Sequence, residues 1–573
     1  MSGRTVITGN EDFREVRENN LYYVDKTSII KDIVESMMRS KVFLFTRPRR
    51  FGKTLTMIML REFFDVTHSS KELFDGLAIS YEQEICKNWM NSNPVIFCSL
   101  KDIKASSATY TESYDRFCSL ASRLCLEHNY LLESNKIPDS TKKRLSALMD
   151  GTASYAAVSD VLLTLSCALH QHWNKKTIIL VDEYDAPLAS VQAGQNYDRL
   201  VSFIGNMLET GFKTNPSLAF SVMTGCLRIA KESVYTGLNH VDCYGIDHVL
   251  YADKFGFTPE EVETLLAEQN LSHKADEIRA WYNGYCFGSD QQIYCPWDVV
   301  KYVADLGANP KARPLAYWSN TSSNDITRKC ISQREWPIEK ALSTLMQGGC
   351  IETTIADSMT YDSLTSTEST LWTLLYLTGY LTKLPDSQQD HDTDLIKLHI
   401  PNKEIRTIFA RDMDRWLNEA ITKLDLTSFF TAFWAGDEKA VTNILSDIIL
   451  DTVSVFDAYK EDYYHAFIHA IFYLHKYEPI SNGEKGHGFA DIVVDDIKDK
   501  KSSRSAVIEV KRADSPNALE HECAEALAQI ERQKYDQKLL SDSRTILHWG
   551  IAFRSKYCLA KCKTIRRPDL HLA

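Results

Sequence analysis

No run of apolar residues in this 573-residue sequence reaches the roughly 18 residues that a membrane-spanning helix needs. The first residues, MSGRTVITGNEDFREV, lack the charged and then apolar pattern of a secretion signal. Internal repeats and long low-complexity tracts are also missing. We therefore expect an intracellular, cytoplasmic protein with no membrane partner.

Positive charge is scarce relative to negative charge. The chain has 65 Lys and Arg against 77 Asp and Glu, which gives a net charge of −12. Such a surface does not coat nucleic acid non-specifically, so any contact with DNA or RNA is expected on one face only. Hydrophobic content of 44% and charged content of 25% are those of a globular protein. The length favours roughly two to four domains.

The 14 cysteines form no ladder of paired C-x-x-C motifs. The closest pair is Cys558 and Cys562 in YCLAKC, and a buried helical face explains it better than a metal site does. We expect reduced, mostly structural thiols, as in a reducing compartment.

Short apolar runs alternate with longer helical patterns in residues 1–250. Continuous apolar runs of this kind are typical of strands that are buried on both faces of a parallel sheet. We therefore predict an α/β domain with a parallel sheet and helices on both faces. The runs are KVFLFT (41–46), VIFCSL (95–100), TIILVDEYD (177–185) and LAFSVMTG (218–225).

Two further regions follow. Residues 251–450 are predicted to form a helical middle or lid region, in which 370–384 is a helix that runs into a turn at Gly379 and a strand. Residues 451–573 show a different order, helix–strand–strand–helix, and therefore form a separate α/β domain. Its predicted elements are 461–477, 488–497, 505–512 and 518–540.

The stretch RPRRFGKTLT (47–56) follows the first strand and begins a helix. A phosphate-binding P-loop reads G-x-x-x-x-G-K-[ST], and here Gly52, Lys53 and Thr54 match while Arg47 replaces the first glycine. Lys53 would reach the β- and γ-phosphates of ATP, and the Thr54 hydroxyl would ligate Mg²⁺. A basic turn that happens to contain GKT is the alternative.

A second element supports a nucleotide site. The strand in TIILVDEYD ends at Asp182, which would hold Mg²⁺, followed by Glu183, which would polarise the attacking water from the opposite face of the strand end. Thr224 ends another strand and would sense the γ-phosphate, or is a satisfied turn threonine. Three arginines are candidates for neutralising transition-state charge, with an ion-paired or solvated side chain as the alternative for each: Arg49, Arg50 and Arg228.

A second group of residues, on two predicted strands near the end of the sequence, suits a divalent metal site. Asp491 lies on one predicted strand, and Glu509 and Lys511 lie two residues apart, on one face of the next. The carboxylates would hold Mg²⁺ or Mn²⁺, and the lysine would orient or activate water. Glu484 and Glu461 are candidates for an additional carboxylate. An exposed cross-strand ion pair is the alternative.

The quoted motifs bear a family resemblance. The segments 22–36, 43–64 and 179–188 resemble the AAA-ATPase-like family of P-loop proteins, in which the loop usually reads R-P-R-R-F-G-K, so Arg47 follows that pattern. The resemblance implies that Asp25 and Lys26 lie near the nucleotide, unless they form a salt-bridged helix start. Further blocks resemble the same family, and their aromatic residues are expected in the core: 223–240, 281–288, 294–300, 317–324 and 400–406.

The C-terminal pattern resembles the PD-(D/E)XK phosphodiesterase superfamily, many members of which have a motif with a glutamine on the helix that follows these strands. Gln529 and Tyr535 match that motif here, and the glutamine would order the metal-bound water or touch the backbone. The sequence thus predicts an ATP-binding and ATP-hydrolysing protein with a nuclease acting on DNA or RNA, gated by nucleotide. A nucleic-acid-binding protein that does not cut, and a signalling or assembly ATPase that changes oligomeric state, remain alternatives.

Overall fold

The computed structural model describes residues 4–103, 109–189, 195–213, 215–227, 241–320, 339–356, 367–390, 393–411, 426–452, 461–474, 477, 479–485, 488–496, 504–533, 545–554 and 557–566. The chain divides into two compact units, of which the first comprises Met1–Arg334 with Cys350–Ile408 and the second Glu335–Gly349 with Phe409–Ala573. The three predicted domains, 1–250, 251–450 and 451–573, stay predictions.

A five-stranded parallel sheet lies at the centre of the first unit, in the order β2–β3–β4–β1–β5. Its first four strands coincide with the predicted runs, and the α/β fold is confirmed. β4 lies between β1 and β3, which brings the ends of the three strands to one edge of the sheet. The strands are β1 (Val42–Thr46), β2 (Val95–Ser99), β3 (Thr177–Asp182), β4 (Leu218–Gly225) and β5 (Val241–Tyr244).

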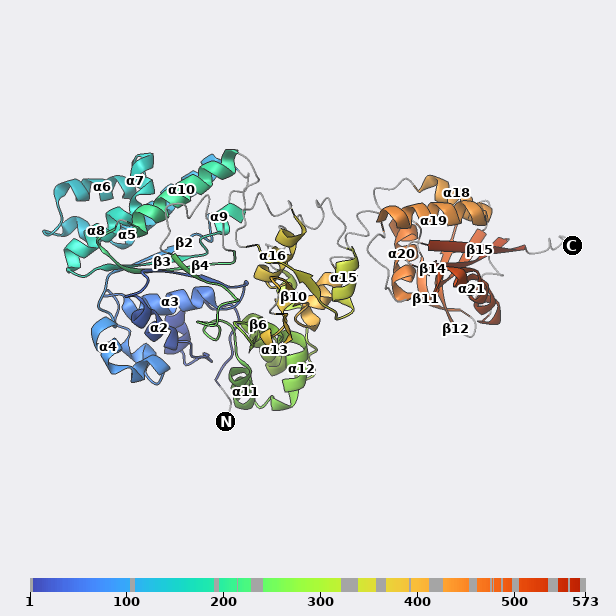
Figure 1. Ribbon diagram of the computed structural model, residues 1–573, viewed down its shortest axis with the longest axis horizontal. Helices are drawn as coiled ribbons and strands as arrows, with labels where there is room; N and C mark the ends of the chain where they lie inside the picture. The colour runs from blue at the N-terminus through green and yellow to red at the C-terminus, as the bar shows by residue number, and fades with distance from the viewer. Residues whose placement is uncertain are drawn as a thin grey trace. The chain divides into compact units, whose positions relative to one another are not determined.

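Helices cover both faces of this sheet (Figure 1), and every residue of β1 and β3 is therefore buried. On one face lie α2 (Ser28–Ser36), α3 (Lys53–Phe64) and α4 (Gln83–Trp89), and on the other α5 (Tyr110–Glu127), α8 (Val161–Trp173) and α10 (Gln195–Phe212). The shorter helices of this part are α1 (Phe13–Glu18), α6 (Asp139–Met149), α7 (Tyr155–Ser159) and α9 (Ala186–Ala189).

Helix α3 fixes the position of the P-loop. Met57, Leu60 and Phe64 recur at helical spacing and are fully buried with Phe43 and Phe45 of β1. Each such side chain contributes about 2 kcal/mol when it is removed from water. The helix is therefore anchored along its length, and its first residues, Lys53 and Thr54, are held at the end of β1.

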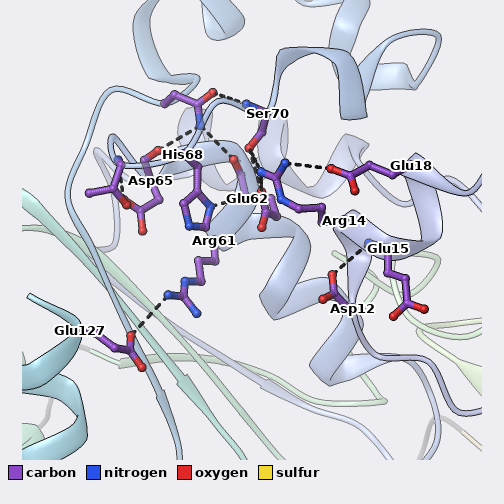
Figure 2. Close-up of polar contacts among 12 residues, drawn as sticks. Asp12, Arg14, Glu15, Glu18, Arg61, Glu62, Asp65, His68, Ser70 and Glu127 are labelled. Carbon is purple, nitrogen blue, oxygen red and sulfur yellow. Dashed lines mark hydrogen bonds and ion pairs between the residues drawn. The ribbon is translucent and has the colours of Figure 1, made fainter.

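The far end of α3 is tied to the N-terminal helix α1 through Glu62 (Figure 2). Its carboxylate accepts hydrogen bonds from Arg14 Nη2 at 2.6 Å and Ser70 Oγ at 2.8 Å, and His68 Nδ1 lies 3.2 Å away. Burial alone would raise the pKa of Glu62, but these three partners outweigh burial and lower it to about 2. The carboxylate is thus charged throughout the neutral range and holds α1 against α3.

The remainder of the first unit is mostly helical, as predicted. Its helices are joined by a β6–β7 hairpin and a small β8–β10–β9 sheet. As predicted for 370–384, helix α16 ends at Gly379, whose φ of +90° suits glycine, and β9 follows. The elements are α11 (Pro259–Glu268), α12 (Ala275–Tyr282), β6 (Tyr285–Phe287), β7 (Gln291–Ile293), α13 (Pro296–Ala308), β8 (Ile351–Thr353), α16 (Glu368–Thr378), β9 (Thr382–Lys383) and β10 (Ile396–His399).

The second unit contains a five-stranded mixed sheet in the order β11–β12–β13–β14–β15, with only the β13–β14 pair parallel. The predicted helix–strand–strand–helix order corresponds to α20, β12, β13 and α21. None of the helices among the described residues is long and apolar enough to cross a membrane. The elements are α15 (Glu339–Met346), α18 (Thr427–Ala435), α19 (Glu438–Thr452), α20 (Glu461–Leu474), β11 (Ile480–Lys485), β12 (Gly488–Asp495), β13 (Arg504–Arg512), α21 (Leu519–Gln533), β14 (Thr545–Arg554) and β15 (Tyr557–Arg566).

The prediction of a helical face for Cys558 and Cys562 is wrong. Both lie on strand β15, which pairs along its whole length with β14. The i, i+4 spacing of the two cysteines suits a helix face, but in a strand residues separated by an even number also share a face, so the spacing alone did not distinguish the two. Cys558 is buried and Cys562 half-buried.

Candidate functional site

The loop between β1 and α3 has the geometry of a phosphate cradle. Arg50 and Gly52 adopt left-handed φ angles of +69° and +83°, which turn the chain sharply into the helix. No side chain caps the start of α3, so its first backbone N–H groups are available to an anion. A Cβ at Gly52 would meet nothing within 4 Å, so glycine is required here for its backbone angle and not for space.

Lys53 is buried inside this loop. Its Nζ donates to the carbonyl oxygens of Arg47 and Pro48, both at 3.0 Å, and lies 3.6 Å from Cys226 Sγ. Burial alone would lower the pKa of Lys53, but the acidic groups facing it, chiefly Cys226 and Glu183, raise the pKa, so the ammonium keeps its charge. A phosphate would take the place of the loop carbonyls as the partner of this cation.

Asp182 brings the two nucleotide motifs together. Thr54 Oγ1 donates to Asp182 Oδ2 at 2.9 Å, and Thr224 Oγ1 donates to Oδ1 at 2.5 Å. Burial raises the pKa of Asp182, and the two hydroxyl donors oppose that shift. Thr54 and Asp182 are oxygen donors of the type that Mg²⁺ prefers, and they already lie within hydrogen-bonding distance of each other.

Glu183 follows the end of β3 in a left-handed conformation, with φ of +52°. Its backbone N–H donates to Thr224 Oγ1 at 3.3 Å. The side chain lines the same cavity as Lys53 and Thr54. The carboxylate is therefore placed beside the phosphate cradle, where a general base for water would be needed.

Tyr184 and Asp185, which were not predicted as site residues, fix the segment after β4. Asp185 accepts the backbone N–H groups of Cys226 at 3.0 Å and Leu227 at 2.9 Å, and Tyr184 OH donates to the Leu227 carbonyl at 2.6 Å. Burial and the charge of Glu183 raise the pKa of Asp185 to about 6. The third acid of the VDEYD motif, Asp185, was the signal in the sequence that could have identified it. Arg228, one residue further on, lies outside the described residues.

The arginines of the loop take different positions. Arg47 is fully buried, donates to the carbonyls of Tyr244 and Tyr251 at 2.8 Å, and packs its guanidinium over Phe255. It thus ties β5 and the following segment to the loop, a structural role that a glycine cannot fill. Arg49 lines the cavity.

Arg50 connects the loop to the middle of the first unit. Its Nη1 donates to the Tyr317 carbonyl at 2.7 Å, and its guanidinium carbon lies 4.4 Å from the centre of the Trp297 ring. Cys295 Sγ lies 3.8 Å from the Arg50 carbonyl oxygen. Residues 294–300 and 317–320, from two blocks that had no assignable role in the sequence, thus meet the P-loop at this residue.

Two fully buried carboxyls, Asp298 and Glu404, lie against each other near Arg50. Glu404 Oε1 accepts the backbone N–H of Trp318 at 2.9 Å. Burial raises the pKa of both carboxyls, and the negative charge of Asp298 raises that of Glu404 further, while Arg50 opposes both shifts. The raised pKa thus favours the neutral, protonated form of Glu404.

Replacing Glu404 by Gln is expected to stabilise the first unit at alkaline pH. A carboxyl whose folded-state pKa is raised stabilises most below its ordinary pKa, and the fold loses stability as the pH rises above that value. The substituted amide would keep a donor toward Asp298 and an acceptor for Trp318 without this loss. At pH 8 we expect a melting temperature about 2–4 °C above that of the wild type, with the difference vanishing near pH 4.

Calorimetry across this pH range measures the effect, with Glu263→Gln as the matched control because Glu263 is largely exposed and lies 3.9 Å from Arg279. A Glu404→Gln protein that melts at a lower temperature than the wild type at pH 8 would contradict the raised pKa of Glu404.

Asp25 and Lys26 form the salt-bridged helix start that was the alternative for this pair. Lys26 Nζ lies 2.7 Å from Glu261 Oε2, and Asp25 accepts the backbone N–H of Thr27 at 2.8 Å. Lys26 also lines the cavity at the P-loop.

A second candidate site lies on β13 of the second unit. Glu509 is buried, and its Oε1 accepts hydrogen bonds from Lys511 Nζ at 3.3 Å and from the Gln529 amide. The three predicted residues are therefore in contact, on adjacent elements β13 and α21. Helix α21 packs closely on strand β14, because residue 550 of that strand is glycine. A Cβ there would lie 2.5 Å from the carbonyl oxygen of Cys523 in the helix.

The backbone places Asp491 beside this group. β12 and β13 are neighbouring antiparallel strands, as predicted, and Ile492 pairs with Ile508. Asp491 precedes Ile492 and Glu509 follows Ile508, so in antiparallel strands the two lie opposite each other in the sheet. Glu484 lies on β11, paired with Phe489 of β12. The side chains of Asp491, Glu484 and Glu461 and all of Tyr535 lie outside the described residues.

The case for a metal ion at the acidic residues rests on the type of donor atoms that they offer. Within the described ranges, no three His, Cys, Asp or Glu side chains gather in a group that could hold a metal ion. At the second site, two carboxylates from adjacent strands, Asp491 and Glu509, would be the ligands of a divalent ion, with Lys511 next to them. This donor set fits Mg²⁺ or Mn²⁺.

The fold and the two sites define a P-loop ATPase-like domain and a nuclease-superfamily domain in one chain. Residues 7–235 match a family described as a predicted AAA-ATPase, and residues 459–562 match the PD-(D/E)XK nuclease superfamily. The chain is also similar to a curated protein of Azotobacter chroococcum mcd 1, described as an uncharacterized protein in the vnfD 5′ region. The two are 23% identical over 408 residues, which cover 71% of this chain and 69% of that protein.

Proposed function

We propose that the first unit binds and hydrolyses ATP with Mg²⁺. The observation that carries this proposal is the convergence of Lys53, Thr54, Thr224 and Asp182 at one sheet edge, at the distances given above. Lys53 neutralises the β- and γ-phosphates, Thr54 and Asp182 hold the metal, and Glu183 orients the attacking water. Arg49 and Arg50 line the same cavity and supply further positive charge.

The second unit acts as a metal-dependent phosphodiesterase on DNA or RNA. Its support is the contact of Glu509 with Lys511 and Gln529, beside a strand that carries Asp491. The metal supplies charge for the phosphodiester oxygen and lowers the pKa of its bound water. Glu509 is a ligand, Lys511 orients the water, and Gln529 holds the Glu509 carboxylate in place.

Nucleotide bound to the first unit controls cleavage by the second. Its support is the link from Arg50 of the P-loop to the middle segment through Tyr317 and Trp297. We expect ATP to change the rate of cleavage of single- and double-stranded DNA and RNA in Mg²⁺ or Mn²⁺, and we expect this change to disappear in Lys53→Ala. Cleavage that is the same with and without ATP in both proteins would refute this control of cleavage by nucleotide.

Light scattering on the same samples detects an ATP-dependent oligomer, the result that an assembly ATPase would give.

A further inference from the structure

The cavity at the P-loop extends well beyond the phosphate-binding residues. It has a volume of about 600 Å³, and its lining includes the charged P-loop together with Lys101 and Glu183. Apolar and aromatic residues from two other parts of the first unit also line it: Val6, Ile7, Tyr22 and Val24 from the N-terminal segment, and Phe257 and Trp297 from the middle. A cavity lined by both charged and apolar residues suits a nucleoside phosphate, which has a charged and an aromatic part.

Trp297 lies next to both the P-loop and the N-terminal segment. Its ring is stacked under Arg50 and is the nearest group to residue 9, where an added Cβ would lie 3.7 Å away. Residue 9 is a glycine with φ of +83°, which lets the N-terminal segment pass the ring closely. The indole therefore borders both the P-loop and the N-terminal residues that line the cavity.

We propose that the apolar part of the cavity lining forms a base-binding subsite in which the nucleotide base packs against Trp297, with Phe257 and the N-terminal segment as further parts of the lining. This inference rests on the proposed ATP site and extends it to the base. The sequence analysis expected the aromatic residues of this block in the core, whereas Trp297 is only partly buried and lines the cavity. A planar aromatic wall binds bases through stacking, and a purine gains more from it than a pyrimidine because its ring is larger.

The test compares two probes, ATP and inorganic tripolyphosphate, on the full-length protein with Mg²⁺. Because tripolyphosphate has no base, Trp297→Ala is expected to weaken ATP binding about 10-fold or more and to leave tripolyphosphate binding unchanged. Trp297→Phe keeps an aromatic face and is expected to retain most of the ATP affinity. Unchanged tripolyphosphate binding also shows that the P-loop is still folded and that Arg50 has not moved.

Trp281→Ala is the matched control, since Trp281 packs against the helices of the middle and does not line the cavity. All affinities are measured below the melting temperature of each variant. Equal ATP affinity in the wild type and Trp297→Ala, or an equal loss for ATP and tripolyphosphate, would overturn the base subsite. Failure of the ATP site itself gives a different result: neither probe binds the wild type, or both bind Lys53→Ala as tightly.

Discussion

Replacing Lys53 by Ala is expected to lower ATP turnover about 100-fold or more, since it removes a buried cation from the transferring phosphate. Lys53 Nζ already donates to two carbonyls of the loop that would enclose the phosphates. Its pKa is raised by the surrounding acids, so it carries full charge at neutral pH. The release of inorganic phosphate from ATP measures the loss.

Lys31→Ala is the control for this variant. Lys31 lies on α2, outside the cavity, and forms a partly exposed ion pair with Glu82 at 2.7 Å. Exposed pairs of this kind contribute little to stability, so turnover should be that of the wild type. Undiminished turnover in Lys53→Ala, with a wild-type melting temperature, would show that the phosphates lie elsewhere.

Glu509→Gln is expected to reduce nucleic-acid cleavage by at least about 100-fold, because the amide is a poor metal ligand and even an outer partner of a metal site changes activity by 10–100-fold. Lys511→Ala should lose cleavage to a similar extent but still bind metal. The two variants therefore differ in Mn²⁺ affinity, measured by electron paramagnetic resonance, although both lose activity.

Glu520→Gln controls for the loss of a carboxylate in the same unit. Glu520 lies on the exposed side of α21, 3.6 Å from Lys561. Its replacement should leave both cleavage and Mn²⁺ binding unchanged. If Glu509→Gln bound Mn²⁺ as tightly as the wild type, Glu509 would not be a ligand, and the β13 site would need a different assignment.

Much of the architecture was available from sequence patterns. Uninterrupted apolar runs predicted four of the five strands in the parallel sheet, since a strand buried on both faces must be apolar throughout. The short strand β5 was missed because its four residues, VDCY, are mostly half-buried and carry a charge. Residues of β15 were wrongly predicted to be helical, because the i, i+4 spacing of Cys558 and Cys562 is compatible with one face of a helix and with one face of a strand.

The candidate site was predicted only in part, because local spacing reveals motif residues but not contacts between distant segments. Motif residues such as Gly52, Lys53 and Asp182 lie at fixed offsets from strands, so their positions follow from local spacing. Trp297 and Asp298 are neighbours in one segment and Glu404 lies in another. Both segments are far from Arg50 in the sequence, and only the packed fold brings them to it. The role of Arg47 was equally hidden, because its partners Tyr244 and Tyr251 lie about 200 residues away in the sequence.

A crystal structure of the full chain with Mg²⁺ and a non-hydrolysable ATP analogue tests the central claim most directly. We expect the triphosphate over the backbone of Gly52 to Thr54, the metal between the Thr54 hydroxyl and Asp182, and the base against Trp297. A nucleotide bound elsewhere, or a metal without Thr54 and Asp182 in its surroundings, would contradict the account.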